Sequence, residues 1–215
     1  DSLHYRSQWL GEIHLYSQIS PRASEKYKDQ PIYLFSSLPK DESLDAIKPK
    51  RVRMDASLHE DPIKIEELAN SVCIFDDIDV ITDRKIRQAV YDILNQILEI
   101  GRHFKCNCIC TNHLPTNGRE TRRLLNEAHV ITYFPHSAGG RIKYMLEEYV
   151  GLDRKQIAYI KRQKSRWCTI FKNYPMTYMM EHEVGLLASD SEEEYEKKGK
   201  KTNRNQMEEP IEDHG

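Results

Sequence analysis

The most informative segment of the sequence is Ser71-Val72-Cys73-Ile74-Phe75-Asp76-Asp77-Ile78-Asp79. A short apolar run that ends abruptly in acids is typical of a strand buried in a parallel sheet. Such a strand would carry Asp76 and Asp77 to its carboxyl end, where the chain leaves the sheet. The sequence on either side of this stretch indicates what surrounds that strand.

Helices and further strands follow in alternation. Asp83 is placed to cap a long helix that runs to about Arg102, with apolar residues at three- and four-residue spacings. The next apolar run, 106–110, ends in the polar residues Thr111-Asn112-His113, and the earlier run 32–35 ends in Ser36-Ser37. This alternation predicts an α/β fold with a mostly parallel sheet and helices on both faces. The polar strand ends would then share one crevice.

The second half of the chain continues the pattern. A helix is expected from Asn117-Gly118 to about Glu127, then a strand over 130–134 and helices near 140–149 and 153–163, with Asp153 capping the last one. Residues 167–171 and 176–180 are expected to form a terminal pair of strands.

Four apolar residues followed by two acids match the Walker B pattern. In that interpretation Asp76 holds Mg²⁺ through water, and Asp77 orients or deprotonates an attacking water. Asn112 would be the sensor, a neutral amide that contacts the terminal phosphate or positions the water. The alternative is an acidic turn at Asp76, Asp77 and Asp79 that caps the next helix, with Asn112 at an ordinary strand exit.

Composition excludes several classes of protein. The chain has 215 residues, of which 39% are hydrophobic and 31% charged, enough for one domain with a real core. Its mean hydropathy is -0.72, and it has neither a membrane-spanning apolar run nor a secretion signal, so we expect a protein that is not secreted. Five cysteines, an odd number, argue against a disulfide scaffold. Alternate cysteines on a strand would lie about 7 Å apart, too far to bind one tetrahedral zinc ion.

Charge is unevenly distributed along the chain. Residues 189–215 carry nine acidic and five basic side chains and few aromatic ones, which predicts a disordered tail. Residues 1–188 carry a small basic excess despite the net charge of -2 for the whole chain. That balance permits contact with a nucleic-acid backbone without requiring it.

Five segments carry a resemblance to a known family. In motif order and spacing they resemble the poxvirus-type DNA-packaging ATPases of large double-stranded DNA viruses, a branch of the FtsK/HerA superfamily of P-loop ATPases. The resemblance runs from about Lys26 to Leu187. The segments are 71–79, 97–104, 108–113, 121–127 and 133–137.

The resemblance implies a fold and a set of site residues. It implies a RecA-like, P-loop type sheet over residues 26–188, with ATP and Mg²⁺ as cofactors, Asp76 and Asp77 as the Walker B pair and Asn112 as the sensor. Three arginines are candidates for a finger that acts on the neighbouring subunit's nucleotide, although a solvated surface charge is an equally good interpretation of each. They are Arg102, Arg122 and Arg123.

The family's P-loop, Gly-x-x-x-x-Gly-Lys-Ser/Thr, is absent from this chain. Residues 1–25 stand in its place and contain no lysine, so that only Gly11 marks the position. Reading the same codons one nucleotide later can give Gly-Pro-Ser-Gly-Leu-Gly-Lys-Ser-Thr-Tyr, beginning at Arg6. We therefore predict a frameshift, either in the gene itself or in its determined nucleotide sequence. This prediction requires that Glu12 be encoded by GAA, because only that codon gives a lysine in the shifted frame. The alternative is divergence of an inactive paralogue.

The resemblance also implies a function and partners. We expect an ATP-driven translocase that packages viral genomic DNA into capsids during virion assembly. It would form a homo-oligomeric ring, contact double-stranded DNA without sequence specificity and dock on capsid or portal components, in the virion or in the viral factory of the host cell. The alternative is a catalytically inactive subunit without a P-loop that binds DNA or other assembly components. A cellular HerA-like or conjugation-type pump would share the same chemistry.

Overall fold

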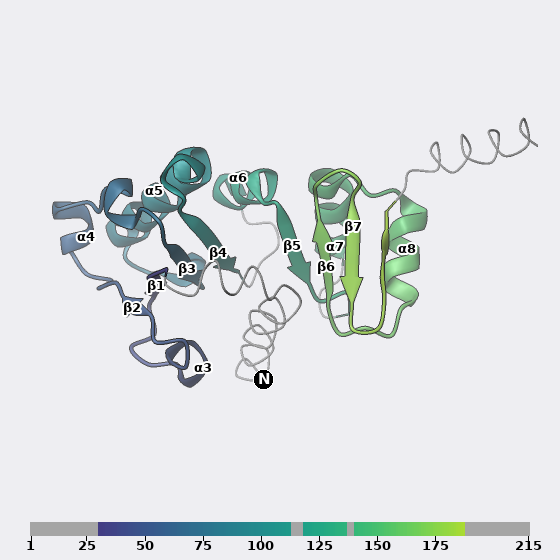
Figure 1. Ribbon diagram of the computed structural model, residues 1–215, viewed down its shortest axis with the longest axis horizontal. Helices are drawn as coiled ribbons and strands as arrows, with labels where there is room; N and C mark the ends of the chain where they lie inside the picture. The colour runs from purple at the N-terminus through teal and green to yellow at the C-terminus, as the bar shows by residue number, and fades with distance from the viewer. Residues whose placement is uncertain (1–29, 113–117, 137–139, 188–215) are drawn as a thin grey trace, which may run out of the picture. The chain divides into compact units, whose positions relative to one another are not determined.

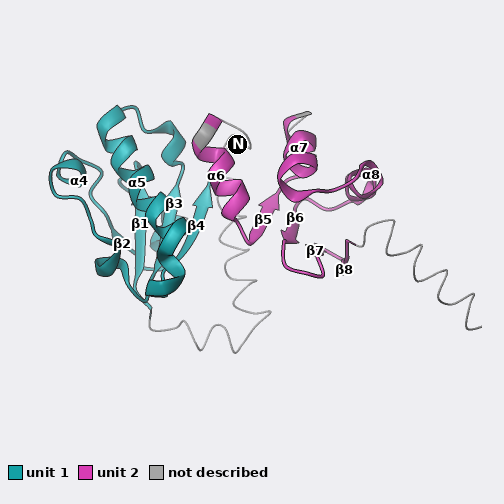
Figure 2. Ribbon diagram, turned by 90° about the horizontal axis from the view of Figure 1, so that it is seen from above, with its two compact units in different colours: residues 1–114 teal, residues 115–215 magenta. Residues whose placement is uncertain are grey.

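The computed structural model describes residues 30–112, 118–136 and 140–187 (Figure 1). The chain divides into two compact units, unit 1 over 1–114 and unit 2 over 115–215 (Figure 2). The boundary falls inside the region 26–188 that the sequence analysis treats as one domain. The predicted N-terminal segment 1–25, with Gly11, and the predicted tail 189–215 lie outside the described residues.

Unit 1 is built on a four-stranded parallel sheet with the strand order β2-β1-β3-β4. The predicted strands and the long helix between them are all present. The strands are β1 (Ile32–Ser36), β2 (Lys50–Arg51), β3 (Val72–Asp76) and β4 (Asn107–Thr111). The helices are α3 (Glu42–Asp45), α4 (Ser57–Glu60) and α5 (Arg84–Ile100), with 3-10 turns at Ile65–Leu68, Ile78–Val80 and Gly101–Phe104.

Helix α5 covers one face of this sheet. The predicted cap is confirmed, because the Asp83 carboxylate accepts hydrogen bonds from the backbone N–H groups of Lys85 and Ile86 at 2.8 and 3.1 Å. The apolar side of α5 packs on a core that includes Phe35 and Phe75 from neighbouring strands. On the other face of the sheet, a smaller cluster forms around Leu34, Leu44 and Ile74. Apolar residues on both faces explain why β1 and β3 are continuous apolar runs.

Cys73 lies on β3 and Cys108 and Cys110 lie on β4, whereas Cys106 directly precedes β4. All five are free thiols, and Cys106, Cys108 and Cys110 pack on the same core beneath α5. The Cys73 and Cys106 sulfur atoms are 3.7 Å apart. The hydrogen bond from the Cys73 thiol lowers the pKa of Cys106 to about 7.

Unit 2 has a different sheet, antiparallel and with the order β5-β6-β7-β8. Its strands are β5 (Val130–Tyr133), β6 (Cys168–Phe171), β7 (Thr177–Met180) and β8 (Val184–Leu186). Its helices are α6 (Gly118–Glu127), α7 (Gly140–Met145), a π-helical turn at Leu146–Val150 and α8 (Arg154–Arg162). The Asp153 side chain caps α8 as predicted, accepting from the backbone N–H groups of Lys155 and Gln156.

The pairing of β5 corrects one expectation. The alternation of strands and helices predicts that 130–134 belongs to a mostly parallel sheet, whereas β5 pairs antiparallel with β6, with Val130 opposite Phe171. The short connections 172–176 and 181–183 can join only antiparallel neighbours, so β6, β7 and β8 form an antiparallel sheet to which β5 adds. The fold is therefore mixed α/β, with a parallel sheet of four strands in unit 1.

Candidate functional site

Three strands of the parallel sheet end at the same level. In β1 and β3, Ser36 lies opposite Asp76, and in β3 and β4, Asp76 lies opposite Thr111. The prediction that the polar ends of these strands meet at one edge is therefore confirmed. This edge carries the acidic pair, with Asn112 directly after Thr111.

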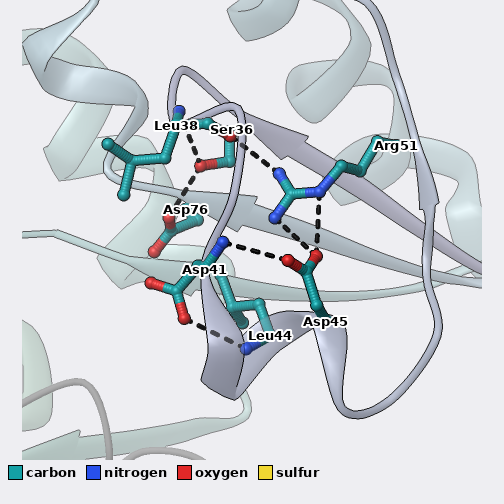
Figure 3. A network of polar contacts seen from close by, with 7 residues as sticks. All are labelled: Ser36, Leu38, Asp41, Leu44, Asp45, Arg51 and Asp76. Carbon is teal, nitrogen blue, oxygen red and sulfur yellow. Dashed lines mark hydrogen bonds and ion pairs between the residues drawn. The ribbon is translucent and has the colours of Figure 1, made fainter.

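The Asp76 carboxylate is held by hydroxyl groups from both neighbouring strands. Ser36 Oγ donates to Oδ2 at 2.9 Å (Figure 3), and Thr111 Oγ1 donates to Oδ1 at 3.0 Å. Only 5% of Asp76 is exposed. A carboxylate that is fixed in this way keeps one orientation, because turning it would break two buried hydrogen bonds.

Asp77 has a left-handed backbone conformation, with φ of 50°. Its backbone N–H donates to Thr111 Oγ1 at 3.1 Å and to Thr111 O at 3.3 Å, so the chain turns while still bound to β4. Aspartate and asparagine tolerate this conformation better than most residues. The side chain of Asp77 is nearly buried, with 8% exposed, and its Oδ1 lies 3.5 Å from Thr111 Oγ1.

The structure disfavours the interpretation of the acids as a helix cap. Helix α5 begins at Arg84, and its cap is Asp83, several residues after the acidic pair. Asp76 is instead the last residue of β3, and Asp77 leads into the short 3-10 turn that precedes α5. The two carboxylates therefore belong to the edge of the sheet.

The loop that follows β1 is tied down beside Asp76 (Figure 3). The Leu38 N–H donates to Ser36 Oγ at 3.2 Å, and Arg51 Nη1 donates to Leu38 O at 2.8 Å. Arg51 Nη2 also pairs with Asp45 Oδ1 at 2.7 Å, and the Arg51 hydrogen bond lowers the pKa of the Asp45 carboxyl. The Asp41 N–H donates to Asp45 Oδ2 at 3.1 Å. These contacts fix the backbone on one side of the acidic pair.

The predicted site residues differ in where they lie. Asn112 is half-buried at the edge that carries the acidic pair, whereas Arg102 is exposed in the 3-10 turn before β4. That turn lies at the amino end of the sheet, where the Asn70 N–H donates to Phe104 O at 2.8 Å. Arg102 therefore lies at the opposite end of the strands from Asp76 and does not contact the acidic pair of its own chain.

The other two arginines belong to unit 2. Arg122 and Arg123 lie on α6; Arg122 is exposed and Arg123 is partly buried. The finger role of each arginine stays a prediction.

Two residues of the site were not singled out from the sequence. Ser36 and Thr111 provide the hydroxyl groups that bind Asp76, although the sequence analysis treats them only as polar strand ends. The signal that could have found them is the rule that identified the acids, a polar residue at the end of an apolar strand. Which hydroxyl reaches which oxygen depends on strand order, which the sequence does not state.

Thr111→Val should lower the free energy of unfolding by about 1–3 kcal/mol, because it leaves a buried carboxylate oxygen without its donor at nearly constant side-chain volume. The matched control is Thr132→Val, which removes a hydrogen bond between neutral hydroxyls at 2.9 Å and should cost about 0.5–1.5 kcal/mol. Urea denaturation followed by circular dichroism measures both. A smaller loss for Thr111→Val than for Thr132→Val would contradict the anchoring role.

The side-chain atoms of Ser36, Asp76 and Thr111 that could bind a metal ion or its water shell are all oxygens. Mg²⁺ prefers oxygen ligands and commonly uses one or two carboxylates together with phosphate and water, so Asp76 with its hydroxyl neighbours fits a water-mediated magnesium site. Within the described ranges, no three or more histidine, cysteine, aspartate or glutamate side chains are grouped so that they could hold a metal ion by themselves. A magnesium ion at this edge would therefore need water and phosphate as further ligands.

None of the helices in the described ranges combines the length and apolarity that a bilayer span requires.

The chain is similar in sequence to a viral protein. The chain is 42% identical over 154 residues to a Sputnik virophage protein named "Uncharacterized protein V3", an alignment that covers 70% of this chain and 62% of that protein. No family model matches the chain, and no solved structure matches it. The chain thus spans less than two thirds of this viral relative.

Proposed function

We propose that this chain is the ATPase subunit of a motor that moves double-stranded DNA into a viral capsid, and that its parallel sheet is of the RecA-like, P-loop type. One observation carries the proposal: the register of β3 with β4 puts Asp76 opposite Thr111, so a buried acidic pair and Asn112 share one edge of a parallel sheet. Ligands of open parallel sheets bind at the carboxyl ends of the strands. The similarity to a virophage protein supports a viral setting.

Each residue of the edge has a distinct role in this proposal. Asp76, oriented by Ser36 and Thr111, would hold the water shell of Mg²⁺. Asp77 would orient the attacking water and accept its proton, and Asn112 would hold that water in line. When bound, magnesium-ATP supplies the γ-phosphate that is attacked. An arginine from the next subunit of a ring would stabilise the developing charge, with Arg102, Arg122 and Arg123 as candidates.

The partners belong to the same proposal. A packaging motor acts as a ring of identical subunits, contacts DNA through its phosphates and docks on capsid or portal components. It works where virions assemble, in the viral factory of the host cell or in the virion.

The decisive experiment compares the chain as written with one in which residues 6–15 are replaced by Gly-Pro-Ser-Gly-Leu-Gly-Lys-Ser-Thr-Tyr. The restored chain should hydrolyse ATP and do so faster with added duplex DNA, because its backbone amides and lysine can bind the nucleotide phosphates. The chain as written should show no turnover above the background. A restored chain that binds ATP without hydrolysing it would contradict the proposal.

A second candidate function follows from the absence of the P-loop in residues 1–25. A chain without the phosphate-binding loop could serve as a non-catalytic subunit that joins a ring or binds DNA. Equal DNA binding by the chain as written and the restored chain, with no turnover in either, would favour that function.

A further inference from the structure

The exposed side of α8 is a basic stripe, made up of Arg154, Lys155, Lys161 and Arg162. These four residues and Ala158 are all exposed and follow the spacing of one helical face. The opposite side of the helix packs into the core of unit 2 through Ile157 and Ile160.

Basic side chains outnumber acidic ones in the part of unit 2 that carries the basic stripe. Residues 118–187 contain twelve basic and seven acidic side chains. Several of these acids are engaged elsewhere in unit 2: Glu147 pairs with Lys143 at 3.6 Å, Glu181 with Arg166 at 2.5 Å, and Glu183 accepts hydrogen bonds from two tyrosines. The Asp153 carboxylate accepts from backbone amides of the first turn of α8.

Helix α5 provides a comparison within the chain. It begins with the same sequence, a capping aspartate followed by Arg84 and Lys85, but its exposed positions further along include Asp92 and Glu99. The ordinary requirements of a helix therefore do not explain the absence of acids on the exposed side of α8. Basic residues in the first turn of a helix also oppose the helix dipole, so Arg154 and Lys155 do not stabilise α8 through it.

We propose that the basic stripe on α8 binds the phosphate backbone of double-stranded DNA. The inference rests on the proposed function and assigns its DNA-contacting surface. The stripe extends about 12 Å along the helix axis. Over that length, one strand of B-DNA presents roughly three or four phosphates, a number that matches the four basic side chains.

Two other anionic partners fit this surface less well. A membrane-binding helix inserts its apolar face into the bilayer, but the apolar face of α8 is already buried in the core of unit 2. Single-stranded nucleic acid is bound largely by aromatic side chains that stack on bases, and the basic stripe contains none. Tyr159 of the same helix is half-buried and donates to Glu183.

The test measures binding of the full chain to a short fluorescent DNA duplex of random sequence, by anisotropy and without ATP, at several salt concentrations. The variant replaces Arg154, Lys155, Lys161 and Arg162 with glutamine. Its affinity should fall by at least about tenfold at low salt, and the slope of log Kobs against log salt should become shallower by about 3 to 4. The control replaces Lys40, Lys48, Arg84 and Lys85, four exposed basic residues of unit 1, with glutamine and should bind like the wild type.

Folding is checked by circular dichroism and thermal melting. The four substitutions should leave the Tm nearly unchanged, because the loss of favourable charge in the last turn of α8 offsets the loss of unfavourable charge in the first. If the fourfold variant does not fold, the two double variants, R154Q with K155Q and K161Q with R162Q, should each show about half the change in salt slope.

The outcomes separate this inference from the proposed function. If the wild type binds duplex DNA and the α8 variant binds equally well, the α8 assignment is overturned and the motor proposal stands. If the wild type does not bind duplex DNA, both are overturned. Tighter binding to phosphatidylserine vesicles or to single-stranded DNA than to the duplex would also overturn the assignment.

Discussion

Asp77→Asn should reduce ATP turnover by about 10²–10⁴-fold in the chain with the restored P-loop, while leaving nucleotide binding largely intact. Asparagine has nearly the same size and also tolerates the left-handed conformation of residue 77. Its backbone N–H keeps both hydrogen bonds to Thr111. The substitution therefore removes the negative charge and the proton-accepting capacity and changes little else. Phosphate release measures turnover, and equilibrium binding of a fluorescent ATP analogue measures affinity.

The control for this prediction is Asp79→Asn. It makes the same chemical change two residues further on, in the 3-10 turn at Ile78–Val80, outside the predicted acidic pair. Turnover should stay close to that of the parent chain. Equal turnover in the Asp77→Asn variant and its parent would remove Asp77 from the catalytic role, and equal losses in the two variants would show that the effect is general to the acidic turn.

Phe75→Ala should lower the free energy of unfolding by about 3–5 kcal/mol, a large part of the stability of an ordinary domain. Phe75 has no exposed surface, and its ring stacks on that of Phe35 with the centroids 4.6 Å apart and the planes 9° apart. The two rings lie opposite each other on neighbouring parallel strands beneath α5. Truncation would leave a cavity directly before Asp76. Urea denaturation followed by circular dichroism measures the loss.

Phe104→Ala is the matched control for the core. Phe104 packs against the same cluster but is only partly buried, so its truncation removes less buried surface and leaves a site that water can fill. Its cost should be clearly smaller than that of Phe75→Ala. A larger loss for Phe104→Ala would mean that the stacked pair is not the centre of this core.

Much of unit 1 could be predicted from local sequence. The buried strands β3 and β4, the long helix α5 and its cap Asp83 all follow from short-range patterns of apolar and capping residues. The strand β8 was missed, because Val184–Leu186 is short, has a central glycine and leaves both of its large side chains exposed. A pattern of three residues with no buried side chain carries too little signal to distinguish a strand from a loop.

The candidate site shows a similar division. The sequence identifies Asp76, Asp77 and Asn112 because strand ends and acidic pairs are local features. The hydroxyls that hold Asp76 come from residues 40 and 35 positions away, so no local pattern could link them to it. The left-handed turn at Asp77 likewise depends on the backbone contact with β4.

Local sequence patterns predicted the longer strands and helices and the polar residues at the strand ends, because periodicity and capping act over a few neighbouring residues. The order β2-β1-β3-β4, the antiparallel partner of β5 and the exposure of the basic stripe on α8 are seen only in the folded chain. These features depend on which distant segments pack together and which face of each element is thereby buried. Strand pairing and burial arise when the whole chain folds, and no local pattern specifies them.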